Sequence, residues 1–261
     1  MSVAVAFEKA RAEGRAALVG YLPAGFPSVP GAVAAIRAMV AAGADLVEVG
    51  LPYSDPVMDG PVIQRASDAA LAGGVRTADV LHTVEQVAGA GAPVVVMTYW
   101  NPVERYGVDR FARDLAAAGG AGLVTPDLIP DEAAEWLATS DAYGLDRIFL
   151  VSPSSTDARL AMTVAHCRGF VYATAVMGVT GQREQTSLAA PELVARVRGT
   201  GTSQPVGVGL GVRDRTQAAA VAAYADAVIV GSALVTALGS GVDALAGLTA
   251  ELAAGVRTRN S

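Results

Sequence analysis

The sequence contains few of the side chains that many enzymes use to form covalent intermediates. Among its 261 residues there is a single lysine, Lys9, which lies near the N-terminus. A Schiff-base aldolase or a pyridoxal enzyme needs a lysine in its pocket. Because Lys9 is far from any predicted strand end, the sequence argues against both classes.

Soft metal ligands are equally scarce. The single cysteine, Cys167, excludes an internal disulfide and a cysteine cluster for metal, and we interpret it as a small buried residue. The two histidines, His82 and His166, lie in segments with helical spacing rather than at predicted strand ends, where a metal aldolase or zinc hydrolase would carry its ligands. Acid–base chemistry therefore falls to carboxylates or tyrosines.

Long apolar runs and basic runs are also missing. No uninterrupted apolar stretch of about 18 residues occurs, so no transmembrane helix is predicted. Residues 1–9 contain Glu8 and Lys9 where a signal peptide would have its apolar core, and we expect a cytoplasmic protein. The net charge of −6 without a basic cluster argues against nucleic-acid binding.

What the sequence does contain is a regular alternation of short, Val-rich segments with Ala-rich helical ones. Strands buried on both faces have this apolar character. Eight strands are predicted, near Ala17–Tyr21, Leu46–Val49, Val94–Thr98, Gly122–Thr125, Arg147–Val151, Phe170–Ala173, Pro205–Val208 and Ala227–Val230. Predicted helices between them include Ala32–Ala42, Arg110–Ala118, Asp131–Ala138, Ala158–His166, Pro191–Arg198 and Arg213–Ala223.

This rhythm over about 250 residues is typical of an α/β protein of the (β/α)8 TIM-barrel type. An open doubly wound sheet is the alternative, but residues 21–27 after the first strand lack the G-x-G-x-x-G pattern. No linker divides the chain. We expect one domain over residues 1–261, with short extra helices, an N-terminal helix near 3–13 and a frayed tail after about 255.

Two carboxylates stand out. Glu48 interrupts the apolar run Leu46–Val49, and a buried charge is costly unless it has a purpose. Asp59 follows in an Asp-Gly-Pro turn. A strand-end glutamate and a loop aspartate can meet in one pocket at the mouth of a barrel. The alternatives are that Glu48 pairs with an arginine in a packed layer and that Asp59 only forms a turn.

Three glycine-containing loops follow the last three predicted strands. They are Gly178–Gly181, Gly207–Gly211 and the Gly231-Ser232 pair, where Ser232 could cap a short helix. Backbone N–H groups at a helix start bind phosphate without lysine. In a barrel these loops lie side by side, and together they favour a phosphate site. The first leads into a polar stretch long enough to act as a lid.

The segment from Glu48 to Pro61 carries a resemblance. The pattern is Glu, an apolar residue, Gly, two residues, an aromatic residue, Ser-Asp-Pro, two residues and Asp-Gly-Pro. This pattern resembles the signature of the tryptophan synthase alpha subunit, the indole-3-glycerol-phosphate lyase component. The likeness covers nearly the whole chain. The departures are Met58, Ala175 and Val208, where many members have a small residue, serine and phenylalanine.

The resemblance implies a retro-aldol cleavage of indole-3-glycerol phosphate to indole and glyceraldehyde 3-phosphate, in tryptophan biosynthesis, without metal or organic cofactor. Glu48 and Asp59 would be catalytic, and Thr180 would bind Asp59 when its loop closes. The implied substrate-binding residues are Tyr21, Tyr172, Thr180, Gly181, Val208, Gly209, Gly231 and Ser232.

The resemblance also implies a partner, a tryptophan synthase beta chain in an alpha2-beta2 complex. Tyr53–Met58, Trp100–Tyr106 and Leu128–Pro130 would form the docking rim. Three alternatives stay open: a free-standing lyase, another phosphate-binding barrel isomerase or epimerase, and a mainly regulatory subunit. The intact Glu48 and Asp59 favour retained chemistry.

Overall fold

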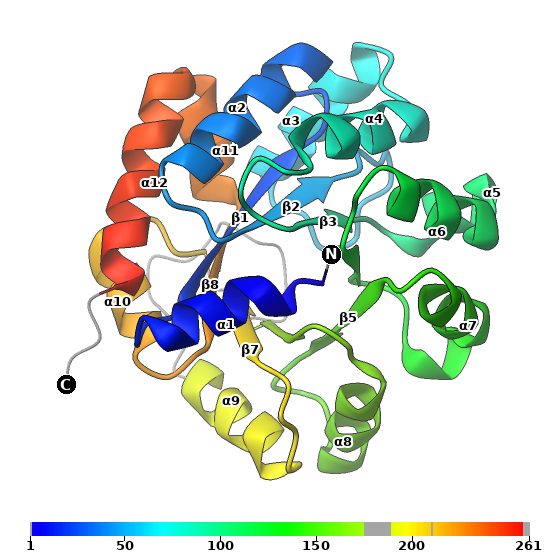
Figure 1. The fold of residues 1–261 in the computed structure, drawn as a ribbon, viewed down its shortest axis with the longest axis vertical. Helices are drawn as coiled ribbons and strands as arrows, with labels where there is room; N and C mark the ends of the chain where they lie inside the picture. The colour runs from blue at the N-terminus through cyan, green and yellow to red at the C-terminus, as the bar shows by residue number, and fades with distance from the viewer. Residues whose placement is uncertain (1, 175–188, 210, 258–261) are drawn as a thin grey trace.

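The chain folds into a closed barrel of parallel strands surrounded by helices, as the computed structural model shows (Figure 1). The structure describes residues 2–174, 189–209 and 211–257. Their eight strands pair in chain order, and β8 returns to β1. The strands are β1 (Ala17–Pro23), β2 (Leu46–Gly50), β3 (Val94–Met97), β4 (Gly122–Thr125), β5 (Asp146–Val151), β6 (Val171–Thr174), β7 (Val206–Gly209) and β8 (Ala227–Val230). The predicted (β/α)8 barrel is confirmed.

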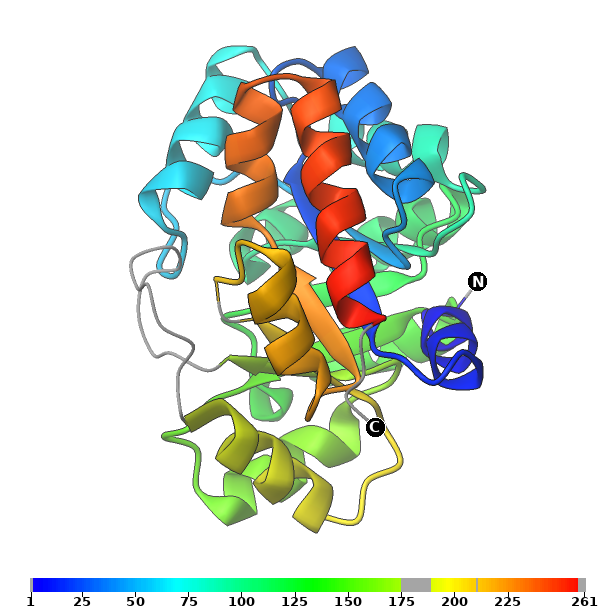
Figure 2. The same ribbon diagram turned by 90° about the vertical axis from the view of Figure 1, so that its left-hand side faces the viewer.

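Helices cover the outside of the barrel, and most follow a strand directly (Figures 1 and 2). They are α1 (Ala4–Ala12), α2 (Val29–Ala41), α3 (Pro61–Ala72), α4 (Thr77–Val87), α5 (Trp100–Tyr106), α6 (Val108–Ala117), the 3-10 turn η1 (Pro130–Glu132), α7 (Ala134–Ala142), α8 (Asp157–His166), α9 (Ala189–Gly199), α10 (Arg215–Ala222), α11 (Ser232–Gly239) and α12 (Val242–Val256). None of the helices in the described residues is long and apolar enough to cross a membrane.

Several predicted helices begin at other residues than expected, and the structure explains two of these shifts. The segment predicted as one helix from Asp131 is divided, because Ala133 leaves helical geometry (φ −94°, ψ 16°) and separates η1 from α7. The helix predicted from Arg213 begins at Arg215, since the Asp214 carboxylate accepts the Gln217 N–H at 2.8 Å and caps it. A side-chain cap of this kind fixes the first turn.

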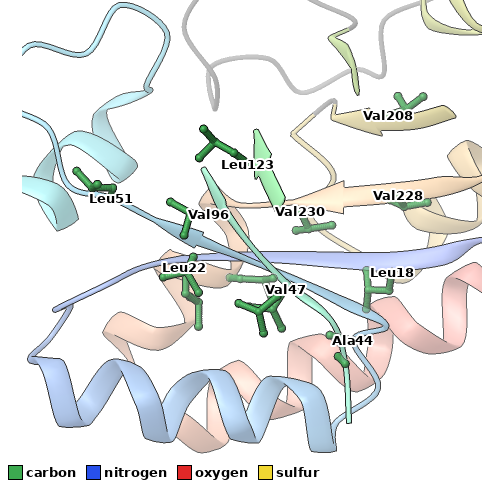
Figure 3. Close-up of a cluster of buried hydrophobic side chains, with 14 of the residues drawn as sticks. Leu18, Leu22, Ala44, Val47, Leu51, Val96, Leu123, Val208, Val228 and Val230 are labelled. Carbon is green, nitrogen blue, oxygen red and sulfur yellow. The ribbon is translucent and has the colours of Figure 1, made fainter. Parts of the chain in front are cut away.

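Both faces of the strands are buried, and their side chains pack in two separate layers. Alternate residues such as Leu18, Val47, Val96 and Val208 point outward and pack under the helices (Figure 3). The residues between them, including Val19, Leu46, Val95 and Val124, fill the barrel interior. This alternation follows from the two-residue period of a strand, and it decides which side chains can reach the barrel mouth.

The N-terminal end of the barrel is closed by α1, which lies across it in Figure 1. Phe7 packs on Phe170 with ring centroids 5.4 Å apart, within the cluster that fills the interior. Asp146, the first residue of β5, accepts hydrogen bonds from the Val3 N–H and the Ser2 hydroxyl, both at 2.8 Å. The opposite, C-terminal end is where a site can form.

Candidate active site

Glu48 lies in the barrel interior, near the C-terminal end of β2. It pairs in register with Tyr21 on β1 and Val95 on β3. Its side chain is fully buried, and neither carboxylate oxygen has a hydrogen-bond partner among the described residues. The described residues therefore give no support to the alternative of a Glu–Arg pair. A buried carboxyl that lacks partners prefers its neutral form, and burial raises the pKa of Glu48 to about 8.

Asp59 lies in the loop between β2 and α3, partly buried. The Tyr99 hydroxyl donates a hydrogen bond to Asp59 Oδ1 at 3.1 Å, and the Gln64 side chain donates to the Asp59 carbonyl at 2.7 Å. Burial raises the pKa of Asp59, and the Tyr99 hydrogen bond acts in the opposite direction. A hydrogen bond to the charged form favours ionisation, so Tyr99 supports an ionised Asp59.

Two tyrosines face Glu48 from other strands. The pKa of Tyr21 is raised by burial and by the charges of Asp59 and Glu48, which places both carboxylates around one phenol. The pKa of Tyr172 on β6 is raised by burial and by Glu48. The structure thus brings together four of the residues predicted from sequence: Tyr21, Glu48, Asp59 and Tyr172.

The side chains beside these groups are apolar. Met97 and Leu150, partly buried at the ends of β3 and β5, pack with Tyr172 on the interior cluster. Sequence reasoning missed both residues. The two-residue alternation from Val95 to Met97 and from Ile148 to Leu150 would have placed them at the barrel mouth. A flat aromatic ring fits a wall of this kind.

Two of the predicted phosphate loops follow neighbouring strands, β7 and β8. Gly209 ends β7, and a side chain there would collide with the Tyr172 hydroxyl. Gly231 precedes α11 and lies beside the Tyr21 ring. Gly231 holds the N-cap position of α11 and Ser232 is the first helical residue, so the expectation that Ser232 caps this helix is wrong. The first turn of α11 nevertheless starts at the barrel mouth, where its N–H groups suit an anion.

Of the other expected residues, one points away from this site and two lie outside the described residues. Val208 is fully buried in the outer layer, pointing away from the interior (Figure 3). Thr180 and Gly181, with the predicted lid and Ala175, lie outside the described residues. Within the described part of the chain, no three His, Cys, Asp or Glu side chains are grouped to hold a metal ion.

These features define a class of protein: a (β/α)8-barrel enzyme with two carboxyl groups that lie beside apolar side chains and a helix N-terminus at the barrel mouth. The family model of the tryptophan synthase alpha chain matches residues 7–260. The chain belongs to this family.

Relatives and solved structures agree. The chain is 70% identical to the tryptophan synthase alpha chain of Salinispora arenicola, over 98% of both chains, and 67% identical to that of Mycobacterium marinum, over 98% of this chain and 94% of the relative. It is similar to a structure of Mycobacterium tuberculosis tryptophan synthase, with a TM-score of 0.94, 65% identity and 98% coverage of both chains. The tryptophan synthase subunit alpha of Legionella pneumophila matches at a TM-score of 0.86 and 33% identity, over 98% of both chains.

Proposed function

We propose that this chain cleaves indole-3-glycerol phosphate to indole and glyceraldehyde 3-phosphate, the tryptophan synthase alpha reaction, with Glu48 and Asp59 as its catalytic residues. The single observation that carries the assignment of roles is the buried carboxyl of Glu48, without a hydrogen-bond partner among the described residues and with its pKa raised to about 8. Near neutral pH such a group can both give and take a proton.

Glu48 gives one proton and takes one proton in the proposed reaction, so its protonated form is restored at the end. Its acid form gives a proton to C3 of the indole ring, which becomes cationic. The resulting carboxylate then takes the proton of the adjacent glycerol hydroxyl. As that oxygen forms the aldehyde, the carbon–carbon bond breaks and its electron pair returns to the ring. Indole is released, and Glu48 is protonated again.

Asp59 acts as a fixed charge in this scheme. Its carboxylate accepts the indole N–H and stabilises the positive charge that builds up on the protonated ring. A positioned charge in a partly dry site commonly lowers a barrier by a few kcal/mol. Met97, Leu150 and the two tyrosines would enclose the ring. Gly209, Gly231 and Ser232 would hold the phosphate through backbone N–H groups and the serine hydroxyl.

The rim around this site would dock a tryptophan synthase beta chain, in an alpha2-beta2 complex. Val57 is 73% exposed and Ile129 is 41% exposed, and both lie on loops at the C-terminal end of the barrel. Exposed apolar side chains on one rim suit a protein contact. We place the reaction in the cytoplasm.

One assay tests the proposal: indole release from indole-3-glycerol phosphate, measured with and without an added beta chain. We expect release by the chain alone and faster release in the complex. No release in either condition would overturn the proposed reaction. Release that does not respond to the beta chain, together with no co-elution on a sizing column, would favour a free-standing lyase.

A further inference from the structure

The hydroxyl of Tyr99 bonds to two consecutive residues of the Asp59 loop. Tyr99 follows β3 and is 5% exposed. Its hydroxyl donates to Asp59 Oδ1 at 3.1 Å and accepts the Met58 N–H at 3.0 Å. One phenol from the β3–α5 segment therefore holds both the carboxylate and the backbone of a loop that leaves the neighbouring strand.

The Tyr99 ring is held in turn by a second tyrosine. The ring of Tyr53 lies against it, with centroids 5.4 Å apart and the planes tilted by 37°. The Asn101 side chain, on α5, donates to the Tyr53 hydroxyl at 2.9 Å. The two loops are thus joined at two levels: Tyr99 to Asp59 on the inside, and Asn101 to Tyr53 nearer the solvent.

The loop that carries Asp59 needs such a support. It has no strand pairing between Gly50 and Pro61, and Ser54, Asp55 and Val57 are exposed. Among the described residues, Tyr99 is the side chain that hydrogen-bonds the Asp59 carboxylate. A carboxylate on an unsupported loop would have to be ordered whenever substrate binds, at a cost in free energy.

We propose that Tyr99 is a positioning residue for Asp59, fixing the direction of the carboxylate before substrate arrives, with Tyr53 as its support. This inference rests on the catalytic role proposed for Asp59. With Oδ1 bonded to Tyr99, Oδ2 is the oxygen turned to the indole N–H. Pre-set geometry of this kind enters kcat more than KM, because it serves the charge that develops on the ring.

The titratable groups facing Asp59 are Tyr99 from the β3–α5 segment, Tyr21 from β1 and, beyond Tyr21, Glu48 from β2. Of these, the Tyr99 hydroxyl is the one that lowers the pKa of Asp59. Loss of that hydroxyl should raise the pKa of Asp59 and so shift the acid limb of the rate profile to higher pH.

The test compares Tyr99→Phe with Tyr143→Phe in the full chain. Tyr143→Phe is a matched control, because its hydroxyl also donates to an aspartate, Asp109 at 3.0 Å, on the outer helices. Both variants keep the ring and lose one Tyr–Asp hydrogen bond. The measurements are kcat, KM, the pH profile of kcat/KM and the thermal midpoint, with Asp59→Asn as the reference for the role of Asp59.

We expect Tyr99→Phe to lower kcat about ten- to a hundredfold, the usual effect of a misplaced catalytic group, with KM changed less than about threefold and the acid limb moved to higher pH. Tyr143→Phe should leave kcat and the profile unchanged. If Tyr99→Phe keeps kcat within twofold, or moves kcat without moving the acid limb, Tyr99 does not position Asp59.

Two further outcomes distinguish the role proposed for Tyr99 from the role proposed for Asp59. If Asp59→Asn itself keeps near-normal activity, the role of Asp59 fails, whatever Tyr99→Phe does. If Tyr99→Phe does not fold, Tyr53→Phe replaces it, since this variant removes only the hydroxyl that Asn101 binds. Tyr53→Phe should lower kcat severalfold and shift the acid limb in the same direction, and an unchanged kcat would overturn the inference.

Discussion

The ring of Tyr21 occupies the space that a side chain at Gly50 would fill. Gly50 lies two residues beyond Glu48 on the same strand, and Tyr21 pairs in register with Glu48. The missing Cβ at Gly50 therefore lets an aromatic ring lie across the end of β2, directly above the candidate acid.

Gly50→Ala should displace that ring. Overpacking a filled site typically costs about 1–3 kcal/mol, and here the cost falls on Tyr21 and on the wall of the pocket. We expect kcat/KM to fall at least about tenfold with the fold retained. Gly247→Ala on α12 is the control, because its added methyl meets nothing within 4 Å and should leave activity unchanged. Equal activity in the two variants would contradict this account.

Glu48→Gln keeps the shape of the side chain and removes its titratable proton. General acid–base catalysis contributes about 10²–10⁴-fold, so we expect turnover to fall at least about a hundredfold. The exposed Glu251→Gln on α12 should have wild-type turnover. A Glu48→Gln enzyme that retains a tenth of wild-type activity would remove Glu48 from the mechanism.

The rate should also depend on pH in a specific way. The reaction starts from protonated Glu48, whose pKa is about 8, and from ionised Asp59, whose pKa is raised above its ordinary value by burial. The profile of kcat/KM should therefore be bell-shaped and decline above about pH 8. A flat profile from pH 7 to 10 would contradict the acid role of Glu48.

Stability should fall as the pH rises, because Glu48 ionises more readily in the unfolded chain than in the folded one. Its proton is held more tightly in the folded chain, with a pKa of about 8 against an ordinary value of 4.5. The contribution to folding is then complete below about pH 4.5 and is lost as the pH rises towards 8. Urea unfolding at pH 5.5 and 8 should show a larger loss in the wild type than in Glu48→Gln, by a few kcal/mol. Equal losses would show that the pKa of Glu48 is not raised in the folded chain.

Gly231→Asp would put a carboxylate beside the proposed phosphate position. Because like charges in a partly dry site repel strongly, glycerol phosphate should bind at least about tenfold more weakly. Gly239→Asp, at the exposed far end of α11, carries the same charge and should bind normally. Gly231→Ala separates size from charge, since its methyl would meet Tyr21 at an ordinary 3.5 Å. Normal affinity in Gly231→Asp would place the phosphate elsewhere.

Much of the fold was readable from local pattern. Segments such as Val94–Met97 and Ala227–Val230 are short, apolar and β-branched, and each is a barrel strand. Glu48 could be singled out because a charge in such a segment conflicts with burial. The helix starts were less predictable, since they depend on one residue: the geometry of Ala133 delays α7, and the Asp214 cap delays α10.

The contacts of the site were harder to predict. The hydrogen bond from Tyr99 to Asp59 joins two loops 40 residues apart, and no local pattern records it. The orientation of Val208 was available in principle, because Gly207 and Gly209 alternate with it and the barrel interior takes every second residue. The roles of Thr180 and Gly181 stay predictions, as do those assigned to the other site residues.

The helix across the N-terminal end of the barrel determines the route of the product. Val3, Ala6, Phe7 and Ala10 continue the packed interior without a break, and Asp146 fastens the start of α1 beneath it. The barrel is thus closed at its N-terminal end and open at its C-terminal end. A molecule formed beside Glu48 could not leave through the closed end. Indole must then leave through the mouth by which the substrate entered, so any protein seated on that mouth receives the product before the solvent does.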